Sequence, residues 1–252
     1  MDSTAYGTVS GTASSVPKPD SHWALFLDID GTLLDIAISP DAVVVPPLLT
    51  PLLARCASWL DGALALVSGR PLAQIDRLMA PLVLPCAGEH GGVIRLAGGA
   101  VEHAGAALAV PQAWTERLRV ATRDWTGVIV EEKSYGVAVH FRKAPARDGE
   151  IRALVYGVVS ENAEDFEALP ASMAVEIRNR RLTKAEPVMR FMAQPPFRDR
   201  VPVFIGDDVT DQDGFRAALG MGGIALDVHQ AFAGKPSEVL RWLDAGVPTK
   251  GH

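Results

Sequence analysis

Residues 25–32 constrain the fold most strongly, because they join a short apolar run to two closely spaced carboxylates. Residues 24–27 are all apolar, as is typical of a buried strand. Asp28 and Asp30 follow, and a Gly-Thr pair then turns the chain. In an open parallel α/β sheet, ligands bind just beyond the carboxyl ends of the strands. The stretch therefore predicts a rigid strand that presents two carboxylates to a ligand.

The Asp28–Asp30 pair has two interpretations. Two close carboxylates repel each other unless a cation or a shared proton relieves the repulsion. They would suit a hard-metal site with one Asp free to act as a nucleophile or as an acid/base. The alternative is an ordinary turn at the end of a strand, where Asp-Gly is common.

Two later apolar runs end in polar groups in the same way. Residues 63–67 precede Ser68-Gly69-Arg70, and residues 201–205 precede a Gly followed by Asp207-Asp208. If the three strands are neighbours in a parallel sheet, all of these groups meet at one edge. So many carboxylates need a cation, and Mg²⁺ suits them because it takes oxygen ligands and retains waters for a phosphate.

Two further groups at this edge would suit a phosphate. Ser68 and the following Gly, at the start of a helix, offer a hydroxyl and free N–H groups to phosphate oxygens. Lys184 opens another helix and would supply a compact positive charge for phosphoryl transfer. Ser68 as a plain helix cap and Lys184 as a solvated surface residue are the alternatives.

The order of elements predicts an α/β protein with an inserted α+β unit. A Ser/Thr/Gly/Pro-rich tail over residues 1–20 is expected to be disordered. Strands and helices alternate in 21–97 and again in 179–252, whereas 98–178 has an α-β-β-α-β order. The expected helices span 46–60, 72–79, 113–125, 150–166, 184–192, 214–219 and 237–243. The expected strands span 24–27, 63–67, 82–84, 93–96, 127–130, 135–141, 173–177, 201–205 and 223–228.

Composition excludes several classes of function. The chain has 252 residues, 48% of them hydrophobic, and a net charge of −6 without a Lys/Arg-rich run. We therefore expect neither a nucleic acid nor a membrane as partner, since no stretch of about 18 apolar residues occurs. Cys56 and Cys86 fall in apolar patterns and are expected to be buried and unpaired. No secretory signal is visible, so the cytoplasm is the expected location.

Four motifs together resemble those of the haloacid-dehalogenase superfamily of phosphatases. They are Asp28-Ile29-Asp30-Gly31-Thr32, Ser68, Lys184 and Gly206-Asp207-Asp208-x-x-Asp211. The resemblance implies a Rossmann-like core with a parallel sheet, and the insert resembles the α/β cap of the sugar-phosphatase branch. More finely, the chain resembles trehalose-6-phosphate phosphatases at Gly88-Glu89-His90-Gly91, Glu131-Glu132-Lys133, His140-Phe141-Arg142 and Glu176-Ile177-Arg178.

The resemblance assigns the catalytic roles. Asp28 would attack phosphorus and form an aspartyl-phosphate. Asp30 would protonate the leaving sugar oxygen and then activate water. Ser68 and Lys184 would hold the transferring phosphoryl group.

The resemblance also implies the ligands of an Mg²⁺ ion. They are the Asp28 carboxylate, the Asp30 carbonyl and Asp207, with Asp208 acting through the water shell of the metal. Asp211 would support the site through hydrogen bonds, although it is an equally good cap for the following helix.

Substrate contacts are implied in the insert and at the second motif. Glu131, Lys133 and Glu176 match the family positions that bind sugar hydroxyls. A solvated hairpin turn is the alternative for the first two, and pairing with Arg178 or Arg180 for Glu176. The other candidate substrate-binding residues are Ser68, Gly69, Arg70, His90, His140 and Arg142. Of these, His90, His140 and Arg142 have equally good structural interpretations, and a local cap or ion pair is the alternative for Arg70.

The expected activity is hydrolysis of trehalose 6-phosphate to trehalose and phosphate, with the trehalose-6-phosphate synthase of the same pathway as a candidate partner. The sequence departs from the family pattern at Ala185, where Gly is usual, and at Phe141, where Tyr is commoner. Three alternatives stay open: a phosphatase of another sugar phosphate, such as sucrose phosphate or mannosyl-phosphoglycerate; a phosphomutase; and a sugar-phosphate-binding module without turnover.

Overall fold

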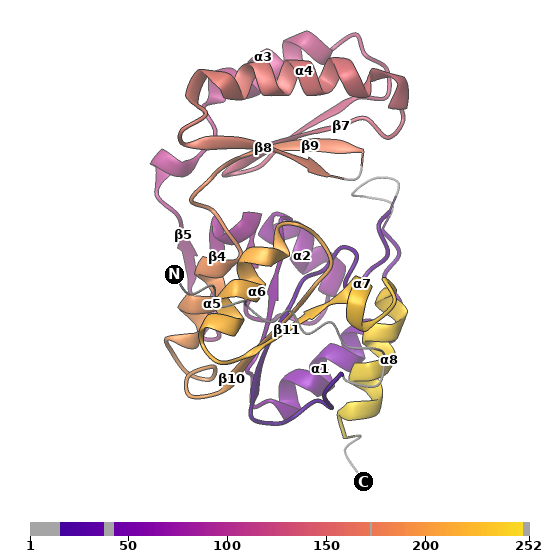
Figure 1. Cartoon of the computed structure of the whole chain (residues 1–252), viewed down its shortest axis with the longest axis vertical. Helices are drawn as coiled ribbons and strands as arrows, with labels where there is room; N and C mark the ends of the chain where they lie inside the picture. Colours follow the sequence, from indigo (N-terminus) through magenta and orange to yellow (C-terminus); the bar gives the residue numbers. More distant parts are fainter. Residues whose placement is uncertain (1–15, 38–42, 172, 249–252) are drawn as a thin grey trace, which may run out of the picture.

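A computed structural model describes residues 16–37, 43–171 and 173–248, which form two β-sheets (Figure 1). The strands of the larger sheet are β1 (Trp23–Leu27), β2 (Leu64–Val67), β3 (Cys86–Gly88), β4 (Val93–Arg95), β5 (Val101–His103), β10 (Val201–Gly206) and β11 (Ile224–Asp227). Their order across the sheet is β11-β10-β1-β2-β3-β4-β5. The first five strands in this order are parallel, and β4 and β5 extend the sheet as antiparallel strands.

Helices cover the larger sheet. They are α1 (Leu49–Trp59), α2 (Leu72–Met79), α5 (Ala185–Met192), α6 (Asp211–Gly220), α7 (Val228–Ala231) and α8 (Pro236–Gly246). In Figure 1, α1 lies against α8, and α5 lies against α6 on the other side of the sheet. A central parallel strand needs cover on both faces, which explains why all five residues of β1 are apolar and buried. Phe26 of β1 contacts Phe191 and Phe197, with ring centroids 6.1 and 5.6 Å away.

The smaller sheet has its own core. Its strands β6 (Ile129–Glu132), β7 (Gly136–His140), β8 (Phe166–Ala171) and β9 (Ala174–Asn179) are antiparallel, in the order β6-β7-β9-β8. Helices α3 (Gln112–Thr122) and α4 (Asp148–Val159) cover one face, and the other face points toward the larger sheet (Figure 1). Trp114 and Phe166 pack edge to face inside this second core, with ring centroids 5.2 Å apart.

The α/β class with an inserted α+β unit is confirmed, and most predicted elements are present within a few residues. The predicted strand at 82–84 is wrong: Val83 is 69% exposed, and the strand begins only after Pro85, at the buried Cys86. Prolines on both sides of 82–84 lack the N–H groups that a central strand donates. The expectation of buried, unpaired cysteines is confirmed.

The predicted helix at 150–166 is too long. It ends at Val159, and β8, which was not predicted, begins at Phe166. The polar segment 161–165 separates the two elements, and Pro170 argues against a strand unless that strand lies at an edge, as β8 does. The short elements β5 and α7 were also not predicted.

The functional division of the chain at residues 98 and 178 stays a prediction. β5, just beyond the first boundary, pairs with β4 of the larger sheet. The predicted tail lies outside the described residues as far as residue 15, whereas residues 16–20 are described. Within them, the Pro17 carbonyl accepts a hydrogen bond of 3.1 Å from the indole N–H of Trp242 in α8. Among the described residues, no helix combines the length and the apolar character needed to cross a bilayer.

We expect Leu27→Ala to lower the free energy of unfolding by about 3 kcal/mol, because the lost side chain leaves a cavity in a packed core. The Leu27 side chain is fully buried in β1. Leu219→Ala is the matched control, since Leu219 of α6 is 47% exposed. Its expected cost is below about 1 kcal/mol. Urea unfolding followed by circular dichroism measures both values, and equal costs would contradict the assignment of β1 to the core.

Candidate active site

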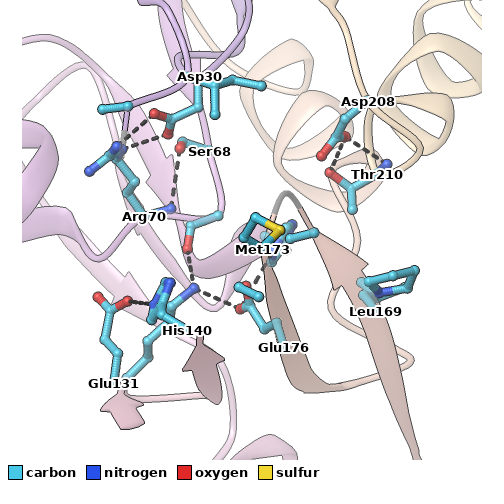
Figure 2. A pocket seen from close by; sticks show the side chains of 18 of the residues that line it. Asp30, Ser68, Arg70, Glu131, His140, Leu169, Met173, Glu176, Asp208 and Thr210 are labelled. Atoms are coloured by element: carbon cyan, nitrogen blue, oxygen red, sulfur yellow. Dashed lines mark hydrogen bonds and ion pairs between the residues drawn. The ribbon is translucent and has the colours of Figure 1, made fainter. Parts of the chain in front are cut away.

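Polar side chains from three neighbouring strand ends meet in one cavity of about 440 Å³. Asp28 follows β1, Ser68 follows β2, and Asp207 follows β10. The parallel pairing of β1 with both of the other strands brings these ends side by side. Glu131 and Glu176 of the smaller sheet line the same cavity from the opposite side (Figure 2). The structure therefore brings the predicted catalytic and substrate-binding residues to one place.

Lys184 is the buried cation of the site. Its Nζ donates to Asp28 Oδ1 at 2.7 Å and to Asp211 Oδ1 at 2.6 Å. Burial alone would lower the pKa of Lys184, but the Asp211 and Asp28 carboxylates outweigh it and raise the pKa well above its usual value. These carboxylates therefore favour the charged ammonium, and the interpretation of Lys184 as a solvated surface residue is excluded by its 2% exposure.

Asp211 is fully buried and holds neighbouring groups in place through hydrogen bonds. Its Oδ2 accepts the backbone N–H groups of Asp207 and Asp208 at 3.0 Å each, while its other oxygen receives Lys184. A Cβ at Gly206 would lie 2.3 Å from the Asp211 carboxyl carbon, so the absence of a side chain at Gly206 makes room for the Asp211 carboxylate. Asp211 starts α6, so it combines the predicted supporting role with a place at a helix N-terminus.

Three carboxylates form a cluster that suits a hard cation. One oxygen each from Asp28, Asp207 and Asp211 lies within 4.8 Å of the others. Burial, followed by the charges of Asp208 and Asp211, raises the pKa of Asp207 to about 6. Three carboxyl groups here face the one ammonium of Lys184, and oxygen donors of this kind are those that Mg²⁺ takes. Gly31, at φ +83°, leaves the space that the Asp207 carboxylate fills.

Asp208 and Asp30 direct their carboxylates elsewhere. Asp208 Oδ1 accepts the backbone N–H and the hydroxyl of Thr210, both at 2.7 Å, and so caps the turn before α6 (Figure 2). Asp30 accepts two hydrogen bonds from Arg70, at 2.5 and 2.6 Å. Of the four predicted metal-binding residues, Asp28 and Asp207 have carboxylates in the cluster, and Asp211 joins them.

Residues 68–70, which follow β2, line one side of the cavity. Ser68 is buried, and its Oγ accepts the backbone N–H of Arg70 at 3.2 Å, so it caps the turn and faces the cavity as well. A Cβ at Gly69 would lie 2.7 Å from His90 Nε2. The absence of a side chain at Gly69 thus lets the imidazole approach the backbone.

Lys133 and Glu176 link the smaller sheet to the larger one. Lys133 Nζ donates to Glu176 Oε1 at 2.8 Å and to the Gly69 carbonyl at 3.0 Å. Burial raises the pKa of Glu176, but Lys133 and the nearby His90 outweigh it and hold the pKa well below 4.5. The alternative partner Arg178 binds Glu167 instead, at 3.0 Å. Glu176 is therefore a buried, ionised group facing the cavity.

Glu131 is fixed at both carboxylate oxygens. His140 Nε2 lies 2.8 Å from Oε2, and Gln74 Nε2 donates to Oε1 at 2.7 Å. Burial opposes ionisation, but these contacts and Lys133 lower the pKa of Glu131 overall. Glu131 and Lys133 are thus not a solvated hairpin turn.

His90 and Arg142 also line the cavity. His90 Nε2 lies 3.7 Å from Glu176 Oε1, and burial lowers the pKa of the imidazole. The His90 backbone has the left-handed φ of 56°, which is uncommon outside glycine and is frequent at functional sites.

Sequence reasoning missed several lining residues. Among them are Gln74 of α2, Lys143 directly after Arg142, and Leu169 and Met173 from the hairpin of β8 and β9. Gln74 lies four residues after Arg70, but Arg70 precedes α2, so helical spacing alone does not predict their contact. The hairpin carried no signal either, because β8 itself was not predicted.

We expect Glu176→Gln to lower the free energy of unfolding by about 2 kcal/mol at pH 7, since it removes the charge that pairs with Lys133. The folded-state pKa lies below the ordinary value of 4.5, so the carboxylate stabilises the protein above pH 4.5 and loses this effect as the pH falls toward the folded-state value. The difference from wild type should therefore shrink below pH 4.5. Denaturant unfolding across pH measures it, with the exposed Glu164→Gln as control; a difference that does not vary with pH would contradict the ion pair.

Known proteins similar to this chain share both its sequence and its fold. The family model for trehalose-phosphatase matches residues 26–235. A probable trehalose-phosphate phosphatase of Sinorhizobium fredii (strain NBRC 101917 / NGR234) is 44% identical over 90% of this chain and 88% of its own length. The trehalose-6-phosphate phosphatase of Escherichia coli (strain K12) is 32% identical over 93% and 86%.

Solved structures agree at the level of the fold. The C-terminal domain of C. albicans trehalose-6-phosphate phosphatase superposes with a TM-score of 0.72 at 19% identity, over 88% of this chain and 91% of that one. A trehalose-6-phosphate phosphatase related protein superposes with a TM-score of 0.66 at 20% identity, over 88% and 95%. With the family model covering most of the sequence, the chain belongs to the trehalose-phosphatase family.

Proposed function

We propose that the chain hydrolyses trehalose 6-phosphate to trehalose and phosphate, through an aspartyl-phosphate on Asp28. One observation carries this proposal: the Asp28 carboxylate, held by Lys184, shares a cavity with the ionised Glu131 and Glu176. Asp28 and Lys184 suit the transfer of a phosphoryl group, and the carboxylates of Glu131 and Glu176 suit the hydroxyls of a sugar. The names of the relatives support the same substrate.

Asp28 and Asp30 would divide the chemistry. Asp28 ends a rigid strand, and Lys184 leaves one of its two oxygens free to attack phosphorus. Asp30 would give a proton to the leaving sugar oxygen and would then take a proton from the attacking water. The side chain of Asp30 is 34% exposed and therefore accessible to water, whereas that of Asp28 is 6% exposed.

The transferring phosphoryl group would be held by Ser68 and Lys184, with the backbone of Gly69 and the Arg70 side chain beside them. The Lys184 ammonium offsets negative charge without entering the reaction, so its contribution is electrostatic. Asp211 would keep that ammonium in place, since it accepts a second hydrogen bond from Lys184.

The carboxylates of Asp28 and Asp207 and the carbonyl of Asp30 would hold Mg²⁺, with Asp208 reaching it through water. When bound, Mg²⁺ supplies positive charge against the phosphate oxygens. The raised pKa of Asp207 supports this assignment, because a second cation would relieve the cost of ionising it.

Glu131, Lys133 and Glu176 would bind the sugar hydroxyls, with His90, His140 and Arg142 around them. All six line the cavity; His90 comes from the loop after β3, and the other five belong to the smaller-sheet unit. A cytoplasmic location, and the trehalose-6-phosphate synthase of the same pathway as a partner, complete the proposal. The charge of −6 is consistent with a small-molecule substrate and not with nucleic acid.

We expect Mg²⁺-dependent phosphate release that favours trehalose 6-phosphate over sucrose phosphate and mannosyl-phosphoglycerate. Asp28→Asn should abolish release, because the nucleophile is lost, and EDTA should do the same in wild type. Colorimetric phosphate assays of the purified protein measure all three effects. Preference for a different sugar phosphate would support the mechanism but contradict the proposed substrate. If wild type binds sugar phosphates but releases no phosphate, the chain is a binding module without turnover.

The sugar-binding role of β6 has a matched control in the sequence. Glu131 faces the cavity, whereas the adjacent Glu132 points away and binds Arg119. We expect Glu131→Gln to lower kcat/KM for trehalose 6-phosphate about twentyfold, as the loss of a charged hydrogen-bond acceptor would do. Glu132→Gln should change it less than about twofold. Equal effects of the two variants would contradict a sugar site at Glu131.

A further inference from the structure

A continuous chain of hydrogen bonds joins the proposed acid/base Asp30 to the proposed sugar ligand Glu131. Arg70 binds both oxygens of Asp30, at 2.5 and 2.6 Å. Arg70 Nη1 donates to Gln74 Oε1 at 3.2 Å, and Gln74 Nε2 donates to Glu131 Oε1 at 2.7 Å. Asp30, Arg70 and Gln74 belong to the larger-sheet unit, whereas Glu131 belongs to β6. The chain of bonds therefore crosses from one sheet unit to the other.

Gln74 suits the middle of this chain by its chemistry. Its carbonyl oxygen accepts from the Arg70 guanidinium, and its amide nitrogen donates to the Glu131 carboxylate. A neutral amide offers an acceptor and a donor on one planar group, whereas a carboxylate at this position would have no donor for Glu131. The side chain is placed by the first turn of α2, which begins two residues after Arg70.

We propose that Gln74 is a positioning residue that couples the binding of a sugar at Glu131 to the orientation of the Asp30 carboxylate. The inference rests on the proposed function. It makes the step in which the protonated Asp30 carboxyl, with one oxygen still accepting from Arg70, gives its proton to the leaving sugar oxygen faster for a substrate that carries sugar hydroxyls than for one that does not.

The orientation of Asp30 needs such a restraint. Its side chain is 34% exposed at the end of a strand, so it relies on its partner for a fixed direction. The Arg70 guanidinium supplies this direction, because a bidentate pair holds the carboxylate in the plane of the guanidinium. Gln74 in turn limits where the long Arg70 side chain can lie.

The other end of the chain is able to hold a sugar without breaking the bond to Gln74. Each oxygen of Glu131 has two lone pairs, and His140 and Gln74 use one on each oxygen. A sugar hydroxyl can therefore donate to a remaining lone pair and restrain Glu131 further. p-Nitrophenyl phosphate has no sugar hydroxyl and would leave this restraint unused.

The test compares two substrates in the Mg²⁺-supplied enzyme. The kcat and KM of wild type and Gln74→Leu are measured with trehalose 6-phosphate and with p-nitrophenyl phosphate. For each enzyme, the kcat for trehalose 6-phosphate is divided by the kcat for p-nitrophenyl phosphate. This ratio is expected to be about tenfold lower in Gln74→Leu than in wild type, as loss of one hydrogen bond to a charged group would produce. Asp76→Asn on the same helix is the control, because Asp76 binds Arg95 outside the cavity and should leave the ratio unchanged.

A double-mutant cycle then separates coupling from two independent effects. If Gln74 acts through Glu131, the variant Gln74→Leu/Glu131→Gln should have a kcat loss no greater than that of the more impaired single variant. Independent roles would instead give a loss equal to the product of the two single losses. That product would overturn the inference.

Two other results would also overturn it. If Gln74→Leu leaves the kcat ratio unchanged, Gln74 has only a local structural role. If Gln74→Leu changes only KM, Gln74 helps Glu131 to bind the sugar but does not orient Asp30. Gln74→Met, which retains the length of the side chain, replaces the Leu variant if circular dichroism shows that the latter is unfolded. A wild-type protein that releases no phosphate from trehalose 6-phosphate would instead reject the proposed function, so the two failures are distinguishable.

Discussion

The contact of Lys184 with Asp28 and Asp211 is the interaction on which the rest of the structure depends. It neutralises part of a buried group of carboxylates that would otherwise repel one another at the carboxyl edge of the sheet. The three residues lie directly after β1, directly before α5 and at the start of α6. One ammonium therefore ties together segments that lie more than 150 residues apart in sequence. Removing it would leave buried charges without a partner, a far larger cost than losing an exposed ion pair.

A second set of polar contacts plays the same part between the two sheets. Lys133 binds both Glu176 of its own sheet and the Gly69 carbonyl of the larger sheet. Gly69 in turn lies against His90, and His90 lies near Glu176. The groups proposed to bind sugar are thus also the groups that hold the smaller sheet over Asp28. Recognition of the substrate and closure of the cavity depend on the same side chains, so changes at these positions are expected to affect both.

The fold was largely predictable because buried parallel strands have a distinctive sequence. Continuous apolar runs marked β1, β2 and β10, and a polar motif followed each of them. The gathering of Asp28, Ser68 and Asp207 at one edge followed from strand order alone. The pairing of Asp30 with Arg70 and the turn of Asp208 toward Thr210 did not, because side-chain partners depend on distances that no local pattern encodes. β8 was missed since its neighbour β9, not its own composition, stabilises it as a strand.

The position of Pro170 in β8 has a consequence for how this protein behaves at high concentration. β8 is an edge strand of the smaller sheet, and such edges are where chains add to one another and begin to aggregate. A proline contributes no backbone donor, so β8 offers a further strand fewer hydrogen bonds than its length suggests. Glu167, earlier in the same strand, adds a charge held by Arg178 and Arg180. The residue that concealed this strand in the sequence thus also protects the folded chain from edge-to-edge association.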